Sequence, residues 1–109
     1  MFELFQSEKS GEYYFRLKAK NGQIILSSEG YTTKAACQNG IESVKKNSQD
    51  EARFDKKETE GGKFRFNLKS TNGQVIGTSQ NYESEAGRDN GVQSVMTNAN
   101  EAEVKDLLA

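Results

Sequence analysis

The sequence predicts an α+β fold in which a duplicated strand-and-helix unit forms one antiparallel sheet with two helices on one face. The first supporting observation is an internal repeat: a shift of 51 residues lays 11–47 on 62–98, and 16 of the 37 aligned positions are identical. The second is that hydrophobic periodicity within each copy changes from two residues to about 3.6, which is typical of strands followed by a helix. The third is that Leu, Ile, Val and Phe account for only 21 of 109 residues, a supply that suits a sheet better than a thick core.

The two copies are expected to fold together. A unit of about 50 residues is marginal as an independent domain, because so short a chain buries too small a share of its surface. We therefore expect a single pseudo-two-fold domain over residues 1–109, with repeat 1 at about 1–51 and repeat 2 at about 52–109. Each copy would complete the hydrophobic core of the other.

Half-buried strands are predicted at the start of each copy. Apolar side chains alternate with polar ones over 13–18 and again over 64–69, the pattern of a strand with one face in the core. Residues 2–6 are expected to form a preceding strand, and 53–57 alternate weakly around Phe54.

An Asn-Gly pair follows each alternating segment. This is the preferred sequence of a two-residue type I′ hairpin turn, because both central residues need positive φ. Return strands are therefore expected directly after the turns, at 24–28 and 75–79. Counting back from the first turn sets Leu17 opposite Leu26 and Lys18 opposite Ile25. The face that carries Leu17 is then the core face.

A helix is predicted in the second part of each copy, with Thr33 and Ser84 as N-caps and the ends near Asn47 and Asn98. Small and apolar side chains recur there at helical spacing, at Ala36, Gly40, Ile41 and Val44 and at Gly87, Gly91, Val92 and Val95. The Asn-Gly pairs inside these stretches are open to interpretation as turns. We favour helices, because glycine in the stripe allows close approach to the sheet and no strand alternation flanks it. Residues 104–108 are either a short final strand or a helical turn.

These features together resemble the YegP-like family of small bacterial proteins, whose function is uncharacterised. The resemblance covers nearly the whole chain and is carried by Leu17-Lys18 and Leu68-Lys69 before Asn-Gly, by Ile25 to Ser28 and Ile76 to Ser79, by Gly40 to Asn47, and by Val104 to Leu107. It implies tandem βββαββ units that build one antiparallel sheet, with C-terminal strands exchanged between the units. It also implies that this two-copy chain is a covalent form of a dimer, and it supplies no catalytic residues.

The repeat departs from strict symmetry at two positions: Leu26 aligns with Gly77, and Cys37 aligns with Arg88. A binding site that needs perfect two-fold symmetry is therefore not expected.

Composition excludes several classes of function. Lys and Arg number 15, Asp and Glu number 16, and the formal net charge is -1, so we expect no binding to duplex nucleic acid, which needs a basic patch. The longest apolar run is Ile24 to Leu26 and the N-terminus carries an acid at Glu3, so we expect neither a membrane span nor a signal peptide. A single cysteine, Cys37, cannot form an internal disulfide and fits a reducing compartment. A soluble, cytoplasmic and monomeric protein is the expectation.

The absence of histidine removes the Ser-His-Asp and Cys-His arrangements and the usual zinc sites. We therefore expect no catalytic residues, no metal and no cofactor. Cys37 is interpreted as an ordinary helix cysteine. The acids Glu83, Glu85 and Asp89 lie near the start of a helix, where carboxylates complement the helix dipole. A small enzyme that uses carboxylate or lysine chemistry is the second alternative function.

The candidate binding site is the sheet face opposite the helices, which mixes aromatic, aliphatic and cationic side chains. Its expected residues are Tyr14, Arg16, Lys18, Ile25, Arg65, Asn67, Lys69 and Ile76. Such a surface suits a protein or peptide partner, and the first alternative is a single strand of nucleic acid. The plainest alternative is a solvated face on which Arg and Lys stems cover scattered apolar groups. The sequence thus favours a non-catalytic binding or interaction module, with the partner itself unknown.

Overall fold

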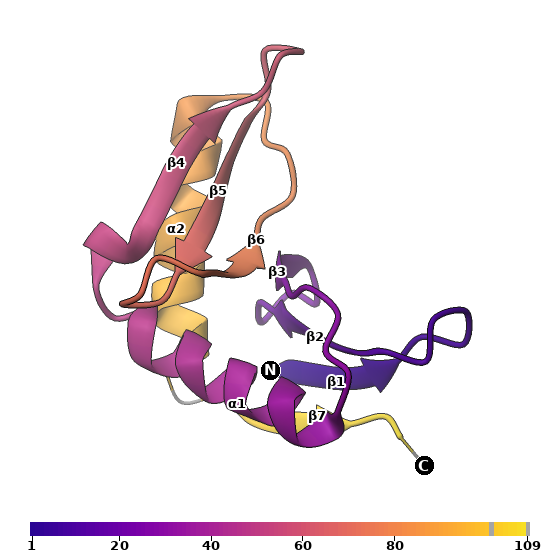
Figure 1. Cartoon of the computed structure of the whole chain (residues 1–109). Helices are drawn as coiled ribbons and strands as arrows, with labels where there is room; N and C mark the ends of the chain where they lie inside the picture. Colours follow the sequence, from indigo (N-terminus) through magenta and orange to yellow (C-terminus); the bar gives the residue numbers. More distant parts are fainter. Residues whose placement is uncertain (101, 109) are drawn as a thin grey trace.

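The structure is a computed structural model that describes residues 1–100 and 102–108. Each copy consists of three strands followed by a helix, and one further strand follows the second helix (Figure 1). The first copy contains β1 (Phe2–Gln6), β2 (Tyr13–Lys18), β3 (Ile24–Ser27) and α1 (Lys34–Asn47). After a 3₁₀ turn at Glu51–Arg53, the second contains β4 (Phe54–Glu58), β5 (Phe64–Lys69), β6 (Val75–Thr78) and α2 (Glu85–Ala99), and β7 is Val104–Asp106. Both predicted N-caps are confirmed, because Thr33 and Ser84 accept hydrogen bonds from the backbone of the first helical turn.

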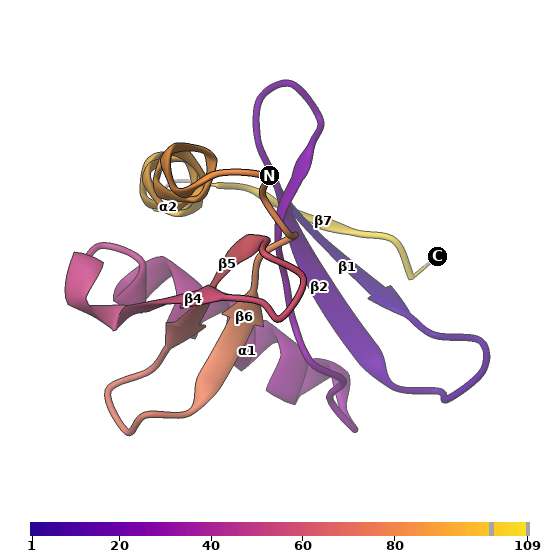
Figure 2. The ribbon, with the colours of Figure 1, turned by 90° about the horizontal axis from the view of Figure 1, so that it is seen from above.

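All strands belong to one sheet in the order β4-β5-β6-β3-β2-β1-β7. The sheet is mixed, which corrects the prediction of purely antiparallel pairing, since β7 runs parallel to β1. The reason lies in the repeat itself. The strand that follows α1 lies beside β5, but the equivalent place for the strand that follows α2 is already filled by β1 beside β2. The last strand therefore adds outside β1, and the two lie side by side (Figure 2).

The expected exchange of strands is found for β7. β7 follows the helix of the second copy but pairs with β1 of the first, whereas β4 pairs with β5 within its own copy. Residues 104–108, left open between strand and helical turn, thus contain a strand.

The two halves of the sheet meet through one residue pair, Ser27 with Thr78. These two residues are equivalent in the repeat, so the pseudo-two-fold axis passes between them. The strands of the halves run in clearly different directions (Figure 1). The halves are therefore held together mainly by side chains under the sheet rather than by backbone pairing.

The hairpin turns differ from the predicted two-residue type. Gly22 and Gly73 have φ of 83° and 84°, whereas no residue other than glycine has positive φ within 1–100 and 102–108. The Gly22 N–H donates to the Ala19 carbonyl at 2.9 Å and the Ala19 N–H donates to the Gln23 carbonyl at 2.9 Å. These bonds define a three-residue loop, a type I turn followed by a left-handed glycine. Only glycine then adopts the left-handed conformation, so Asn avoids it.

A β-bulge follows each loop and changes which side chains reach the core. Leu17 pairs with Leu26 as predicted, but Lys18 pairs with Ile24, and Ile25 becomes the extra residue. The side chain of Ile25 is consequently 4% exposed, and that of Ile76, in the equivalent bulge, is 7% exposed. Both isoleucines belong to the hydrophobic core. Their predicted place on the solvent face is wrong, because a bulged strand loses the two-residue alternation.

Both helices pack on the same face of the sheet, as predicted, and their buried side chains join one cluster with those of the strands. In each copy a tyrosine lies between the helix and the sheet. Tyr31 stacks on Phe15 with ring centroids 6.2 Å apart, and Tyr82 stacks on Phe66 at 6.4 Å. A Cβ on Gly40 would lie 2.4 Å from the Tyr31 hydroxyl oxygen, so the central glycine of the helix makes room for the tyrosine ring.

Candidate interaction surface on the open sheet face

The sheet face opposite the helices, called the open face here, carries most of the residues that the sequence predicted. β2 contributes Tyr14, Arg16 and Lys18, and β5 contributes Arg65, Asn67 and Lys69, all half-buried. They alternate with the core residues of the same strands, so they share one face. Ile25 and Ile76 are absent from it, since both lie in the core.

Neighbouring strands add residues that sequence reasoning missed. By register, Glu3 lies beside Arg16, Asp55 beside Asn67 and Lys57 beside Arg65, and Lys105 of β7 lies beside Glu3. Their strands were too short for periodicity to fix which side chains face outward. The one available signal was the alternation of Phe2 and Leu4 with Glu3 and Phe5.

The first half of the open face contains an ion-pair cluster around a nearly buried carboxylate. Glu3 Oε1 lies 2.7 Å from Arg16 Nε and 3.3 Å from Lys18 Nζ. The hydrogen bond from Arg16 holds the pKa of the Glu3 carboxyl below its usual value. The Arg16 guanidinium lies 4.7 Å from the centroid of the Phe5 ring, which in turn stacks on Tyr14 at 5.8 Å. Arg16 is therefore fixed by both an anion and a π face.

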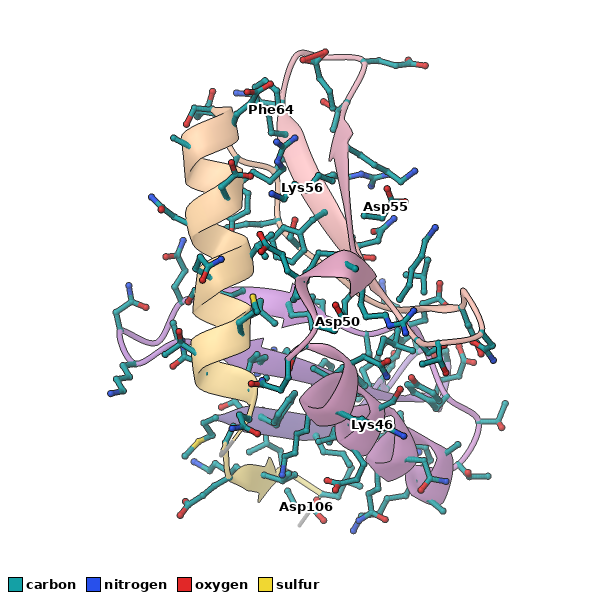
Figure 3. The ribbon with its side chains drawn as sticks, turned by 90° about the vertical axis from the view of Figure 1, so that its left-hand side faces the viewer. Lys46, Asp50, Asp55, Lys56, Phe64 and Asp106 are labelled. Atoms are coloured by element: carbon teal, nitrogen blue, oxygen red, sulfur yellow. The ribbon has the colours of Figure 1, made fainter. Side chains whose placement is uncertain are left out.

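The second half repeats this arrangement with different chemistry. Asp55 Oδ2 lies 3.2 Å from Lys69 Nζ and 3.3 Å from Lys57 Nζ. Burial raises the pKa of Asp55, but hydrogen bonds from the two lysines outweigh it, so the pKa is lowered. Asn67 stands where the first half has Arg16, and its Oδ1 accepts a hydrogen bond from the Thr78 hydroxyl at 3.1 Å. Figure 3 shows Asp55 and Lys56 on opposite sides of β4, with Lys56 directed toward α2, where it pairs with Asp89 at 3.2 Å.

Cationic side chains outnumber acidic ones on the open face. Its strands present Arg16, Lys18, Lys57, Arg65, Lys69 and Lys105 against Glu3 and Asp55. Because the whole chain carries a formal net charge of -1, the remainder of the surface is acidic. The fold thus separates charges that are evenly mixed along the sequence, and it makes the open face positive.

Other chemically notable groups lie away from this face. Burial raises the pKa of the Cys37 thiol to about 11, and its side chain is fully buried. Lys56 lowers the pKa of the Asp89 carboxyl, and Lys34 lowers that of Asp106. Within residues 1–100 and 102–108, no three His, Cys, Asp or Glu side chains are grouped so that they could hold a metal ion. None of the helices described is both long and apolar enough to cross a membrane.

The chain is a tandem-duplicated α+β protein. Its two copies of a strand-and-helix unit interlock in one mixed sheet. The chain matches the family described as Domain of unknown function (DUF1508) twice, over residues 8–55 and 60–106. The chain belongs to this family.

Bacterial relatives agree with this assignment. The chain is 55% identical over 106 residues to the UPF0339 protein in the ptx operon 5′ region of Stutzerimonas stutzeri, covering 97% of this chain and 95% of that protein. The solution NMR structure of a UPF0339 protein from Shewanella oneidensis matches with a TM-score of 0.91 and 51% identity, covering 97% of this chain and 89% of that one. That of yegP from E. coli, described as a protein of unknown function, matches with a TM-score of 0.91 and 46% identity, covering 97% and 90%. The resemblance to YegP-like proteins is confirmed.

Proposed function

We propose that this protein is a non-catalytic binding module whose open face binds an acidic segment of another protein. The observation that carries this proposal is the concentration of cationic side chains on one face of a chain whose net charge is -1. A positive face on an otherwise acidic protein orients an acidic partner as it approaches and repels that partner elsewhere.

The cations of the open face are also held in position. Arg16 is fixed by Glu3 and by the Phe5 ring, and Lys69 is held by Asp55. Side chains that are ordered before binding lose less conformational entropy when a partner arrives. Tyr and Arg are also enriched in the contact regions of protein interfaces. Tyr14 and Arg16 are neighbours on the same face of β2.

Two observations favour a protein partner over the alternatives. Single-stranded nucleic acid binds through successive aromatic platforms, but the stacked pair of Phe5 and Tyr14 has Lys57 and Arg65 in the equivalent places of the second half. General acid catalysis at neutral pH is favoured by a carboxyl whose pKa is raised, whereas neighbouring cations lower the pKa values of Glu3, Asp55, Asp89 and Asp106.

The proposal includes a monomer in the cytoplasm. The second copy occupies the place that a second chain would occupy in a dimer, and Cys37 is a free thiol. Light scattering after gel filtration tests the monomer.

The experiment measures binding of a fluorescein-labelled peptide of alternating Glu and Ser to the full chain by anisotropy at low salt. The test variant reverses two charges on the open face, Arg65→Glu and Lys105→Glu, because neither residue forms an ion pair with a residue that the structure describes. The control, Lys20→Glu with Lys46→Glu, makes the same change in net charge at exposed sites outside the open face.

We expect the peptide to bind the wild type and the control, and the open-face variant to lose affinity by about tenfold or more. Equal loss in both variants shows that net charge alone governs binding and overturns the proposal. A labelled oligo(dT) that binds more tightly than the peptide also overturns it, in favour of single-stranded nucleic acid. Absence of peptide binding at high micromolar protein and low salt has the same consequence for the proposed partner class.

A further inference from the structure

The two copies act as an internal comparison that separates structural polar residues from others. Ser28 and Ser79 are identical because each hydroxyl accepts a hydrogen bond from a strand N–H, of Phe15 and of Phe66, at 2.9 Å. The identity of Asn47 and Asn98 has a similar explanation. Each side-chain amide donates to the backbone and side-chain oxygens of the serine four residues earlier.

Asn39 and Asn90 have no such role. Both are exposed in the middle of a helix, and neither side chain forms a hydrogen bond with a residue that the structure describes. Asparagine in a helix interior is less favourable than alanine by roughly 0.7 kcal/mol. The presence of the same unfavourable residue at the same position of both helices therefore requires another explanation.

The two asparagines line two grooves, each built from both copies, that share a set of equivalent polar residues. In the first groove, of about 340 Å³, Asn39 and Ser43 of α1 face Asn72 in the β5–β6 turn. In the second, of about 200 Å³, Asn90 and Ser94 of α2 face Asn21 in the β2–β3 turn. Each groove thus has one amide and one hydroxyl from a helix and one amide from the turn of the other copy, identical in residue type.

The hydrogen bonds already formed in the first groove decide what remains for a ligand. Asn72 Oδ1 accepts from the Gln74 N–H at 3.1 Å, so its Nδ2 remains to donate. Ser43 Oγ accepts from Asn47 Nδ2 at 3.1 Å, which leaves the hydroxyl hydrogen to donate.

The second groove is arranged in the same way. Asn21 Oδ1 accepts from the Gln23 N–H at 3.0 Å, and Ser94 Oγ accepts from Asn98 Nδ2 at 3.2 Å. Together with the free amide of Asn90, the groove offers a set of neutral donors to acceptor oxygens.

The two grooves differ in the charge of the residues that line them. Glu42 and Lys46 line the first groove, whereas the described residues that line the second groove are all uncharged. A ligand that both grooves recognise is therefore selected by hydrogen bonds to oxygen atoms and not by its charge.

We propose that the two grooves are equivalent binding sites for a neutral, oxygen-rich small molecule of the saccharide class. Hydroxyl and ring oxygens are clustered acceptors without net charge, and a sugar residue is small enough for either groove. The sites are distinct from the open face, because the helices lie on the opposite side of the sheet.

The test is a titration of the ¹⁵N-labelled full chain with maltose and with N-acetylglucosamine, followed through the side-chain NH₂ signals of Asn21, Asn39, Asn72 and Asn90. Saturable shifts are expected in both grooves, with dissociation constants in the millimolar range that agree within about threefold. Shifts confined to one groove, or no saturation with either sugar up to about 100 mM, overturn the proposal. Inorganic phosphate serves as the charged probe, and saturable shifts with phosphate but with neither sugar also overturn it.

The test variant combines Asn39→Ala with Asn90→Ala, changes that favour the helices and so preserve folding. It is expected to lose affinity for the sugar about tenfold, as read from the remaining Asn21 and Asn72 signals. The matched control combines Gln38→Ala with Gln93→Ala, which removes two exposed helix amides outside both grooves and is expected to bind as the wild type does. Equal affinity in the test variant and the wild type overturns the role of the two asparagines.

Discussion

Leu26 and Gly77 occupy equivalent positions in the two copies and lie against each other in the core. A Cβ built on Gly77 would be 2.7 Å from Cγ of Leu26, and both residues are next to the axial pair of Ser27 and Thr78. A site beside a two-fold axis faces its own copy, so two leucines there would compete for one space. At these two equivalent positions the chain has one leucine and one glycine, which fit the space together. The sequence difference between the copies is therefore explained by packing.

This contact predicts that exchanging the two residues restores part of the stability that each single substitution removes. Gly77→Leu alone overfills the space and is expected to destabilise the fold by about 1–3 kcal/mol, and Leu26→Gly alone opens a cavity that costs about 3–5 kcal/mol. The exchanged protein, with both substitutions, again has one leucine beside the axis and is expected to be more stable than the sum of the single effects implies. Urea unfolding of the four proteins measures this, and strict additivity would contradict it.

Ser79→Ala is expected to destabilise the protein by about 1–3 kcal/mol, because the buried N–H of Phe66 loses the hydroxyl to which it donates at 2.9 Å. Ser27→Ala is the control, since Ser27 is exposed and forms no side-chain hydrogen bond with a described residue. Chemical denaturation followed by circular dichroism compares the two. Similar stabilities for both variants would show that water replaces the Ser79 hydroxyl.

Acidification is expected to destabilise the fold partly through Glu3. Its hydrogen bond with Arg16 lowers the pKa of the carboxyl in the folded state below the ordinary value of 4.5. The unfolded state therefore binds the proton first, and the stabilisation that is present above about pH 4.5 disappears as the pH falls through the folded-state pKa. Glu3→Gln should be less stable than the wild type at neutral pH, with a smaller loss between pH 5 and pH 3. Unfolding free energies across that range test this, and parallel profiles would exclude Glu3 as a contributor.

Cys37 is expected to be unreactive in the native protein. Burial raises its pKa to about 11, so only about a thousandth of the thiol is ionised at pH 8, and the sulfur has no solvent exposure. Reaction with Ellman's reagent should be slow in buffer and immediate in guanidinium chloride. Fast reaction of the folded protein would mean that α1 opens readily.

The sequence predicted the repeat, the helices, their N-caps and the pairing of Leu17 with Leu26, because these depend on local patterns. The pairing of Leu17 with Leu26 was predicted correctly, but from a two-residue turn that the structure does not contain. The longer loop at Gly22 shifts the register by one residue, and the bulge at Ile25 shifts it back. Neither device has a distinctive side-chain pattern, so the alternation placed Ile25 on the wrong face.

The remaining differences are non-local. The parallel position of β7 follows from β1 already occupying the place beside β2, a competition between segments about one hundred residues apart. The positive open face was likewise only partly predictable, since Lys57 and Lys105 acquire their neighbours from pairing across strands. The grooves at Asn39 and Asn90 depend on a helix of one copy meeting a turn of the other.

The exchange of strands also sets an order of events during synthesis. β7 covers β1, and the Phe2 N–H donates to the Glu103 carbonyl at 2.8 Å, yet the ribosome makes β7 only after the rest of the second copy. A nascent first copy therefore waits with its outer strand edge unpaired until translation has passed Asp106. During that interval an unpaired edge is open to pairing with other chains, so the rate at which the second half is translated governs how long the nascent protein is prone to aggregation.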